Sequence, residues 1–190
     1  MTEQEKLTRA FIAIEFPDEI VKEIIRVQDE VLKVKFKGKL TEPENLHLTL
    51  KFLGEIDSRK LEEVKRRLKQ VKFNEMELKL GDIGVFNIRG NPKIVWIKVL
   101  GDGIWELQKQ IDLVLEGLFD REERFMGHLT IARIKYVDDK KIFGERIKKI
   151  GVKEIKFENT GFKLKKSVLQ ALGPVYTDLE VYKCNEKYKQ

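Results

Sequence analysis

The same short motif encloses each of the two histidines of this chain, and this repetition constrains the fold more than any other feature. HLTL occupies positions 47–50 and HLTI occupies positions 128–131. Because there are seven threonines in 190 residues, chance would place a threonine two residues after both histidines roughly once in a thousand cases. Common origin or common chemistry is therefore the better explanation.

Similar segments recur around the two motifs at a nearly constant offset. FIAIEFPD (11–18) aligns with VWIKVLGD (95–102) at an offset of 84, the two histidines at 81, and LKLGDIGVF (78–86) with IKFENTGFK (155–163) at 77. A repeat of about 80 residues is too long for a solenoid. We therefore expect an α+β fold of two pseudo-symmetric lobes, each an antiparallel sheet with helices on its outer face, around a central cleft.

The hydrophobic periodicity predicts the order of the elements along the chain. Alternating apolar residues indicate strands, and apolar residues three and four apart indicate helices. Strands are predicted at 9–16, 47–54, 76–86, 93–100, 124–136, 155–167 and 168–184. Helices are predicted at 18–34, 58–71, 105–118 and 139–150, with a lysine-rich loop at 33–44 and a turn at 87–92.

Composition narrows the class of protein and its surroundings. Charged residues make up 37% of the chain and the net charge is +6, which favours an acidic partner such as nucleic acid. The same charge content is also typical of surface ion-pair networks in proteins from hot environments. The single cysteine, Cys184, excludes an internal disulfide and indicates a reducing compartment. Since the first ten residues are polar and no long apolar run follows, we expect a cytoplasmic protein without a membrane partner.

Each His-x-Thr motif is a chemical unit when it lies on a strand. Residues i and i+2 point to the same face, so His47 with Thr49, and His128 with Thr130, each present an imidazole and a hydroxyl together. Two imidazoles on opposite sides of a phosphorus atom suit an in-line displacement, because one can donate a proton while the other accepts one. The threonine hydroxyls can bind the non-bridging phosphate oxygens. This scheme requires no metal ion and no cofactor.

Two other interpretations of the histidines remain open at this point. A single histidine on a strand is most often a packed residue of the core, although the duplicated context argues against this. A pair of histidines can also belong to a zinc site, but no third ligand occurs at ordinary zinc spacing. Asp57 and Asp82 could be proposed as ligands, yet acidic residues are too abundant in this chain for these two to carry a signal.

The order of the motifs resembles that of the two-histidine (2H) phosphoesterases, in particular the RNA 2′,3′-cyclic phosphodiesterases, also called 2′-5′ RNA ligases. The resemblance extends over nearly the whole chain and rests on RAFIAIEFP, HLTLKFLGE, PKIVWIKV, HLTIARIK and SVLQALGPVY, in that order. It implies a single domain over residues 1–190, built of two duplicated lobes that exchange their terminal strands. One departure is Gly127, where the family often has proline; we expect it to change backbone geometry rather than chemistry.

The resemblance implies a role for five residues. His47 would donate a proton to the leaving oxygen, His128 would accept a proton from water, and Thr49, Thr130 and Arg133 would bind the phosphate. Arg133 lies an odd number of residues after His128, so a regular strand would send it to the opposite face. We expect a β-bulge or the end of the strand to bring it round. The alternative for this residue is a surface arginine in an ion pair.

The implied substrate is an RNA end that carries a 2′,3′-cyclic phosphate, tRNA fragments being one candidate. Water would open the cyclic ester to a 2′-phosphomonoester, and a 5′-hydroxyl in place of water would give a 2′-5′ linkage. Nothing in the sequence requires an oligomer, so we expect a monomer. The alternative function is a non-catalytic RNA-binding module on the same scaffold, in which the histidines are relics.

Further contacts with RNA can be proposed outside the motifs. A run of lysines precedes the first motif, at Lys33, Lys35, Lys37 and Lys39. These lysines could contact the RNA backbone, with Phe11 or Phe36 stacking on a base. The other interpretation is a solvated loop or a lysine-protected edge strand. Trp96 and Trp105 are predicted to belong to the core.

Overall fold

The computed structural model of the protein describes residues 7–171 and 173–185, which contain nine strands and four α-helices. The strands are β1 (Thr8–Ile14), β2 (Lys37–Leu40), β3 (Leu48–Ile56), β4 (Met76–Ile88), β5 (Asn91–Leu100), β6 (His128–Tyr136), β7 (Lys156–Asn159), β8 (Gly161–Gln170) and β9 (Gly173–Lys183). The helices are α1 (Asp18–Leu32), α2 (Ser58–Leu68), α3 (Asp102–Val114) and α4 (Lys140–Lys148), with a short 3-10 helix, η1 (Pro43–Asn45).

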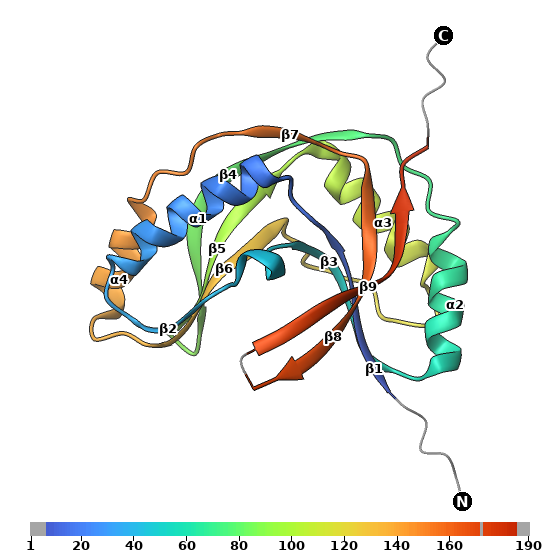
Figure 1. The fold of residues 1–190 in the computed structure, drawn as a ribbon, viewed down its shortest axis with the longest axis horizontal. Helices are drawn as coiled ribbons and strands as arrows, with labels where there is room; N and C mark the ends of the chain where they lie inside the picture. The colour runs from blue at the N-terminus through green and yellow to red at the C-terminus, as the bar shows by residue number, and fades with distance from the viewer. Residues whose placement is uncertain (1–6, 172, 186–190) are drawn as a thin grey trace, which may run out of the picture.

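The strands form one antiparallel sheet that curls into two lobes. Its order is β7-β4-β5-β6-β3-β1-β8-β9, and β2 pairs with β6 beyond the point where β3 leaves it. The first lobe consists of β3, β1, β8 and β9, and the second lobe of β6, β5, β4, β7 and β2. Figure 1 shows β4, β5 and β6 on one side of the molecule and β1, β8 and β9 on the other. The two lobes join where β3 meets β6.

The four helices cover the two lobes in pairs. Helices α1 and α4 pack against β4, β5 and β6 of the second lobe, whereas α3 packs against α2 and β3 and also touches β4. The two pairs lie at opposite ends of the molecule (Figure 1). The expected α+β fold, with two lobes that carry helices on their outer faces, is therefore confirmed.

Each lobe combines strands from both halves of the chain. Strand β4 belongs to the first half but is hydrogen-bonded to β5, and β8 belongs to the second half but is hydrogen-bonded to β1. Neither half of the sequence therefore completes a sheet by itself. The origin of the two halves by duplication stays a prediction.

Local sequence signals account for the start of two helices and for one hairpin turn. Asp57 and Asp139 each precede a helix and accept a hydrogen bond from the backbone N–H three residues later, at 2.7 and 2.9 Å, as N-cap residues do. Arg89 and Gly90 both have positive φ, 50° and 72°, which is typical of the tight turn between two hairpin strands. The two caps fix where α2 begins after β3 and where α4 begins after β6, and the turn fixes the reversal between β4 and β5.

The predicted elements differ from the structure mainly at their ends. The loop predicted at 33–44 contains the short strand β2. The prediction missed this strand because its four residues show no apolar alternation. The strand predicted at 124–136 begins only at His128. The segment 155–184 forms three strands, β7, β8 and β9, rather than two.

Candidate active site

The two motifs meet at the single residue pair that joins the lobes. Leu48 and Leu129 are antiparallel partners, and both are fully buried. The residues on either side of each leucine point to the other face of the sheet, so both histidines and both motif threonines share that face. Each histidine lies across from the threonine of the other motif. Diagonal neighbours in such a pair are about 7–8 Å apart, a separation that a single phosphate group can bridge.

The two imidazoles are held in the same way. Nδ1 of His47 lies 2.7 Å from the carbonyl oxygen of Asn45, and Nδ1 of His128 lies 2.7 Å from that of Met126. A carbonyl oxygen can only accept, so Nδ1 is the donor in both rings and carries a proton. In the neutral ring, Nε2 is then the unprotonated nitrogen. Asn45 is itself fixed, because its side-chain amide donates to the carbonyl oxygen of Pro174 at 3.0 Å.

An aromatic edge contacts each imidazole from within its own lobe. Tyr176 of β9 meets His47 at a centroid distance of 5.3 Å and an interplanar angle of 87°, and Phe86 of β4 meets His128 at 5.0 Å and 85°. The buried Phe11 lies against the His47 ring as well, at 4.9 Å. These contacts restrict the rotation of both rings. Sequence reasoning missed Tyr176 and Phe86, since neither has a motif of its own.

A compact group of four charges lies beside His47. Lys165 of β8 is buried and forms ion pairs with Glu15 and Asp178. Lys163 pairs with the same two carboxylates at 2.5 and 2.6 Å. Two cations and two carboxylates neutralise one another, and together they connect the residue after β1 with β8 and β9 next to the site.

The environment of His47 disfavours its protonated form. Burial is the largest cause, and it lowers the pKa of His47 to about 4. The hydrogen bond to the Asn45 carbonyl acts in the opposite direction, whereas the positive charges of Lys165 and Arg133 lower the pKa further. At neutral pH, His47 of the free protein is therefore a neutral imidazole with an available Nε2.

A β-bulge brings Arg133 to the face of the histidines. Thr130 pairs with Trp96, but the next pair along the strands joins Ala132 to Val95, so Ile131 is an extra residue in β6. The extra residue turns the side chains that follow it to the opposite face of the sheet, as predicted. Arg133 is exposed, and its charge lowers the pKa of His47. It forms no ion pair with any residue that the structure describes, so the alternative interpretation as a surface ion pair does not hold there.

The first motif contains the same irregularity. Thr49 pairs with Ala13 and Lys51 with Ile12, so Leu50 is the extra residue of β3. Phe52 stands five residues after His47, as Arg133 stands five residues after His128. Because of the bulge it turns away from the core, and it is 71% exposed. The two lobes thus present an aromatic ring and a guanidinium at corresponding positions. Sequence reasoning did not single out Phe52, although its spacing from His47 was a usable signal.

Gly127 is required by a close approach of two strands. A Cβ atom at this position would lie 2.7 Å from the carbonyl oxygen of Val99 in β5. Its φ is not among the positive values, so the expected gain in backbone freedom is not the reason for glycine here. The glycine allows the chain to pass close to β5 directly before His128.

The other candidate RNA contacts belong to an edge strand or have packed rings. Lys37 and Lys39 belong to β2, which pairs only with β6, and this favours the edge-strand interpretation of the lysine run. Phe36 packs against Phe143 at 6.2 Å and Phe11 is 3% exposed, so neither ring is an open platform for a base. The placement of Trp105 in the core was wrong, because 49% of this residue is exposed.

The described part of the chain shows neither a metal-binding cluster nor a membrane-spanning helix. It holds no group of three or more His, Cys, Asp or Glu residues arranged to bind a metal ion. Asp57, considered as a ligand above, instead caps α2. Within the described residues, no helix is both long and apolar enough to span a membrane.

Comparison with known proteins identifies the family. A sequence profile described as LigT like Phosphoesterase matches residues 14–96. A Methanocaldococcus jannaschii protein named RNA 2′,3′-cyclic phosphodiesterase is 39% identical over 171 residues, which cover 88% of this chain and 96% of the relative. The chain belongs to the LigT-like 2H phosphoesterases. An Archaeoglobus fulgidus protein of the same name is 34% identical over 179 residues, covering 92% of this chain and 99% of that one.

Solved structures show the same fold for this LigT-like phosphoesterase. A Thermus thermophilus protein superimposes with a TM-score of 0.79 at 25% identity, over 92% of this chain and 97% of its own. Escherichia coli LigT in its apo form gives a TM-score of 0.73 at 22% identity, over 95% and 99% of the two chains. Membership of this family makes the protein a phosphoester hydrolase.

Proposed function

We propose that this LigT-like phosphoesterase hydrolyses RNA 2′,3′-cyclic phosphate ends to 2′-phosphomonoesters through His47 and His128, without a metal ion. The main support is the duplicated geometry, in which two imidazoles are held through Nδ1 by a carbonyl beside the pair that joins the lobes. The relatives from M. jannaschii and A. fulgidus, named RNA 2′,3′-cyclic phosphodiesterases, supply the substrate class.

The proposed reaction is an in-line displacement at phosphorus. Nε2 of His128 takes a proton from water as the water oxygen bonds to phosphorus. The bond from phosphorus to the 3′ oxygen breaks on the opposite side, and Nε2 of His47 gives its proton to that oxygen. Thr49, Thr130 and Arg133 stabilise the charge on the non-bridging oxygens. Protein groups fill every role, so the chemistry needs no metal ion.

His47 has to gain a proton before it can serve as the acid. The positive charges of Lys165 and Arg133 oppose this in the free protein. A cyclic phosphodiester carries one negative charge, which offsets these cations when it binds beside them and raises the pKa of His47. Substrate binding thus prepares the acid.

The reaction is tested by product analysis. The protein is incubated in EDTA with a short RNA that ends in a 2′,3′-cyclic phosphate, and the products are resolved as 2′- or 3′-phosphomonoesters. We expect the 2′-phosphomonoester alone. A 3′-phosphomonoester, or a rate equal to that of buffer, would refute the proposal and favour the non-catalytic RNA-binding module.

The pH dependence of kcat/KM should have its acidic limb near pH 4. The pair acts with one imidazole protonated and the other neutral, so kcat/KM falls about tenfold per pH unit once the free protein takes up a second proton at the pair. The low pKa of His47, about 4, places this second protonation near pH 4. An ordinary imidazole would place this limb near 6.5. Arg133→Gln removes a charge that lowers this pKa and should shift the limb upward, whereas Lys135→Gln, exposed on the same strand, should not. A limb near 6.5 in the unsubstituted protein would contradict the assignment.

Each motif threonine should contribute to the rate. Thr49→Val and Thr130→Val keep the side-chain shape but remove the hydroxyl donor, so we expect kcat to fall by about 10²–10³ for each, as for other donors to developing negative charge. Serine at the same positions should restore most of the rate. Thr177→Val, at an exposed position of β9, is the control. If the valine variants behaved like this control, the hydroxyls would have no part in phosphate binding.

The proposal extends to the setting in which the enzyme acts. The chain works as a monomer in the cytoplasm, as one domain of two duplicated lobes that exchange strands, and its substrates include tRNA fragments with cyclic ends. When a 5′-hydroxyl replaces water, the same two histidines catalyse 2′-5′ joining. Sedimentation at micromolar concentration tests the monomer, and a dimer that buries either histidine would contradict it.

A further inference from the structure

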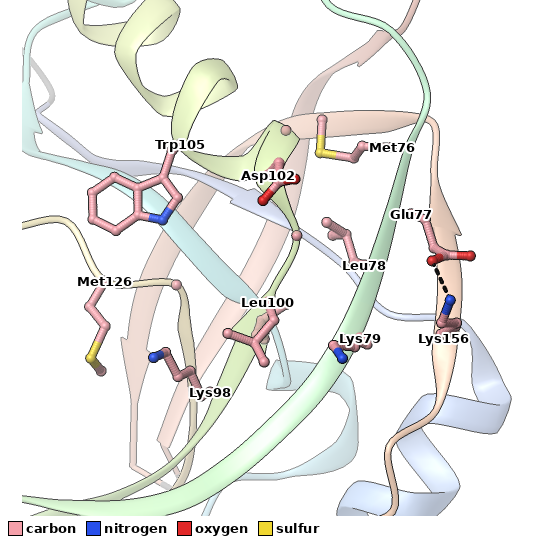
Figure 2. A pocket seen from close by; sticks show the side chains of 14 residues that line it. Met76, Glu77, Leu78, Lys79, Lys98, Leu100, Asp102, Trp105, Met126 and Lys156 are labelled. Carbon is pink, nitrogen blue, oxygen red and sulfur yellow. Dashed lines mark ion pairs between the residues drawn. The ribbon is translucent and has the colours of Figure 1, made fainter.

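A large pocket lies directly beside His128. Its volume is about 670 Å³, within the range of pockets that hold small ligands. It lies between the end of β5, the beginning of α3, β4 and the segment before β6. Figure 2 shows Lys98, Met126 and Trp105 gathered on one side of it, with the ion pair of Glu77 and Lys156 on the other.

The pocket is continuous with the face that carries the histidines. Met126 and Gly127 line it and immediately precede His128, and the Met126 carbonyl oxygen accepts the hydrogen bond from Nδ1 of that histidine. Lys98 also lines it and is the direct cross-strand partner of His128. Partners in an antiparallel pair point to the same face and lie about 4.5–5.5 Å apart. A group bound at Nε2 of His128 can therefore extend into this pocket.

In-line geometry decides which part of the substrate can reach the pocket. The ribose of the cyclic end carries the leaving oxygen and is therefore on the side of His47. The attacking oxygen arrives from the opposite side, where His128 takes its proton. We propose, resting on the proposed function, that this pocket receives the 5′-terminal nucleoside of a second RNA strand, whose 5′-hydroxyl takes the place of water.

The side chains of the pocket suit a nucleoside followed by a phosphate. Trp105 is 49% exposed, and its contact with Phe125, at 5.1 Å and 86°, fixes the orientation of the indole. An exposed indole offers a face on which any base can stack. Asp102 can accept hydrogen bonds from ribose hydroxyls.

Of the lysines that line the pocket, Lys98 is the one available to bind a phosphate. Lys156 is paired with Glu77 at 2.8 Å, and Lys79 with Glu154 at 3.0 Å. Lys98 has no ion pair with any residue in the described ranges. It can therefore bind the phosphate that follows the first nucleoside of the incoming strand, and no existing pair has to be broken.

The joining step balances without a further reactant. The 5′ oxygen of the incoming strand bonds to phosphorus and its proton passes to Nε2 of His128. The bond from phosphorus to the 3′ oxygen breaks, and that oxygen takes the proton of His47. The product is a 2′-5′ phosphodiester with a free 3′-hydroxyl.

The test compares joining with hydrolysis in one reaction mixture. The full chain receives an RNA with a 2′,3′-cyclic end and a second RNA with a 5′-hydroxyl, and both products are measured. We expect Trp105→Leu to reduce the ratio of joined to hydrolysed product by about tenfold or more, in line with the loss of one stacked base. Lys98→Gln should also reduce this ratio, because one contact with a backbone phosphate is lost. Hydrolysis should stay within about twofold, because water does not need the pocket. Lys109→Gln, exposed on α3 outside the pocket, should change neither product.

A second measurement separates this inference from the proposed hydrolysis. Titration with the 5′-hydroxyl RNA alone should quench the indole fluorescence of Trp105, and Trp105→Leu should abolish the saturable part of that signal. If the protein hydrolyses cyclic ends but the variants leave the product ratio unchanged, or no joined product forms, the pocket is not a site for a second strand. If cyclic ends are not hydrolysed at all, the proposed function fails. The fluorescence quenching alone then shows whether the pocket binds the 5′-hydroxyl RNA.

Discussion

Replacing His47 or His128 by alanine should lower kcat on a 2′,3′-cyclic phosphate end by about 10²–10⁴ for each substitution, the usual contribution of a positioned acid or base. The double variant should lose little more, since two groups that act as a unit have strongly non-additive effects. Single-turnover rates in EDTA measure this directly. Unchanged turnover in either variant would exclude the acid–base pair.

The two roles can be separated by the choice of leaving group. A p-nitrophenyl phosphodiester releases an anion that does not need a proton, so it bypasses the acid but still requires the base. On such a substrate, His47→Ala should recover most of the lost rate, whereas His128→Ala should remain slow. The reverse pattern would exchange the two roles and leave the pair itself intact.

The largest effect on stability is expected at a buried ion pair that links β3, the strand of the first motif, to α3. Lys51 of β3 contacts Asp112 of α3 at 2.5 Å and the Asp120 carbonyl oxygen at 2.6 Å, and the side chains of the pair are 5% and 8% exposed. Asp112 also accepts hydrogen bonds from Gln108 and from the backbone N–H of Glu122, at 2.7 and 2.9 Å. Lys51→Met would leave this carboxylate buried without its cation, which should lower the free energy of unfolding by about 3–5 kcal/mol.

The pH dependence gives this destabilisation a signature. Burial by itself would raise the pKa of Asp112, but its hydrogen bonds, first of all that from Lys51, outweigh burial and the pKa is lowered. A carboxyl whose pKa is depressed in the folded state stabilises the protein above its unfolded pKa of about 3.9, and this contribution is lost as the pH falls through the folded pKa. The difference between Lys51→Met and the unsubstituted protein should therefore shrink toward acidic pH.

Two further variants control this prediction in urea denaturation. Lys51→Met combined with Asp112→Leu removes both charges and should recover much of the loss. Lys33→Met breaks an exposed pair with Glu30, whose side chains are 68% and 39% exposed, and should cost less than about 1 kcal/mol. A loss this small for Lys51→Met would show that the buried pair does not stabilise the contact between β3 and α3.

The repeated tetrapeptide was sufficient to predict the two lobes and the face that each motif presents. Alternation along HLTL and HLTI places the leucines in the core, and Leu48 and Leu129 are indeed fully buried partners. The odd spacing between His128 and Arg133 predicted a bulge or the end of the strand, and the structure has a bulge at Ile131. In both cases a fixed local geometry, the two-residue period of a strand, links sequence to structure.

The surroundings of the histidines were not predictable in the same way. Tyr176 contacts His47 and the charge of Lys165 acts on it because β8 and β9 join the first lobe, although they come from the other end of the chain. One lysine among many carries no signal of such a contact. The exposure of Trp105 could have been predicted from the helical period. It lies one residue away from the buried stripe of Ile104, Leu107 and Ile111 and therefore off the apolar face of α3.

A crystal structure with a nucleoside 2′-phosphate, the product of the proposed reaction, would test the central claim most directly. Nε2 of His47 and Nε2 of His128 should lie within about 2.6–3.2 Å of different oxygens on the same phosphorus atom, with Arg133 on a third oxygen. A phosphate held by one imidazole alone, or bound away from the pair that joins the lobes, would contradict it.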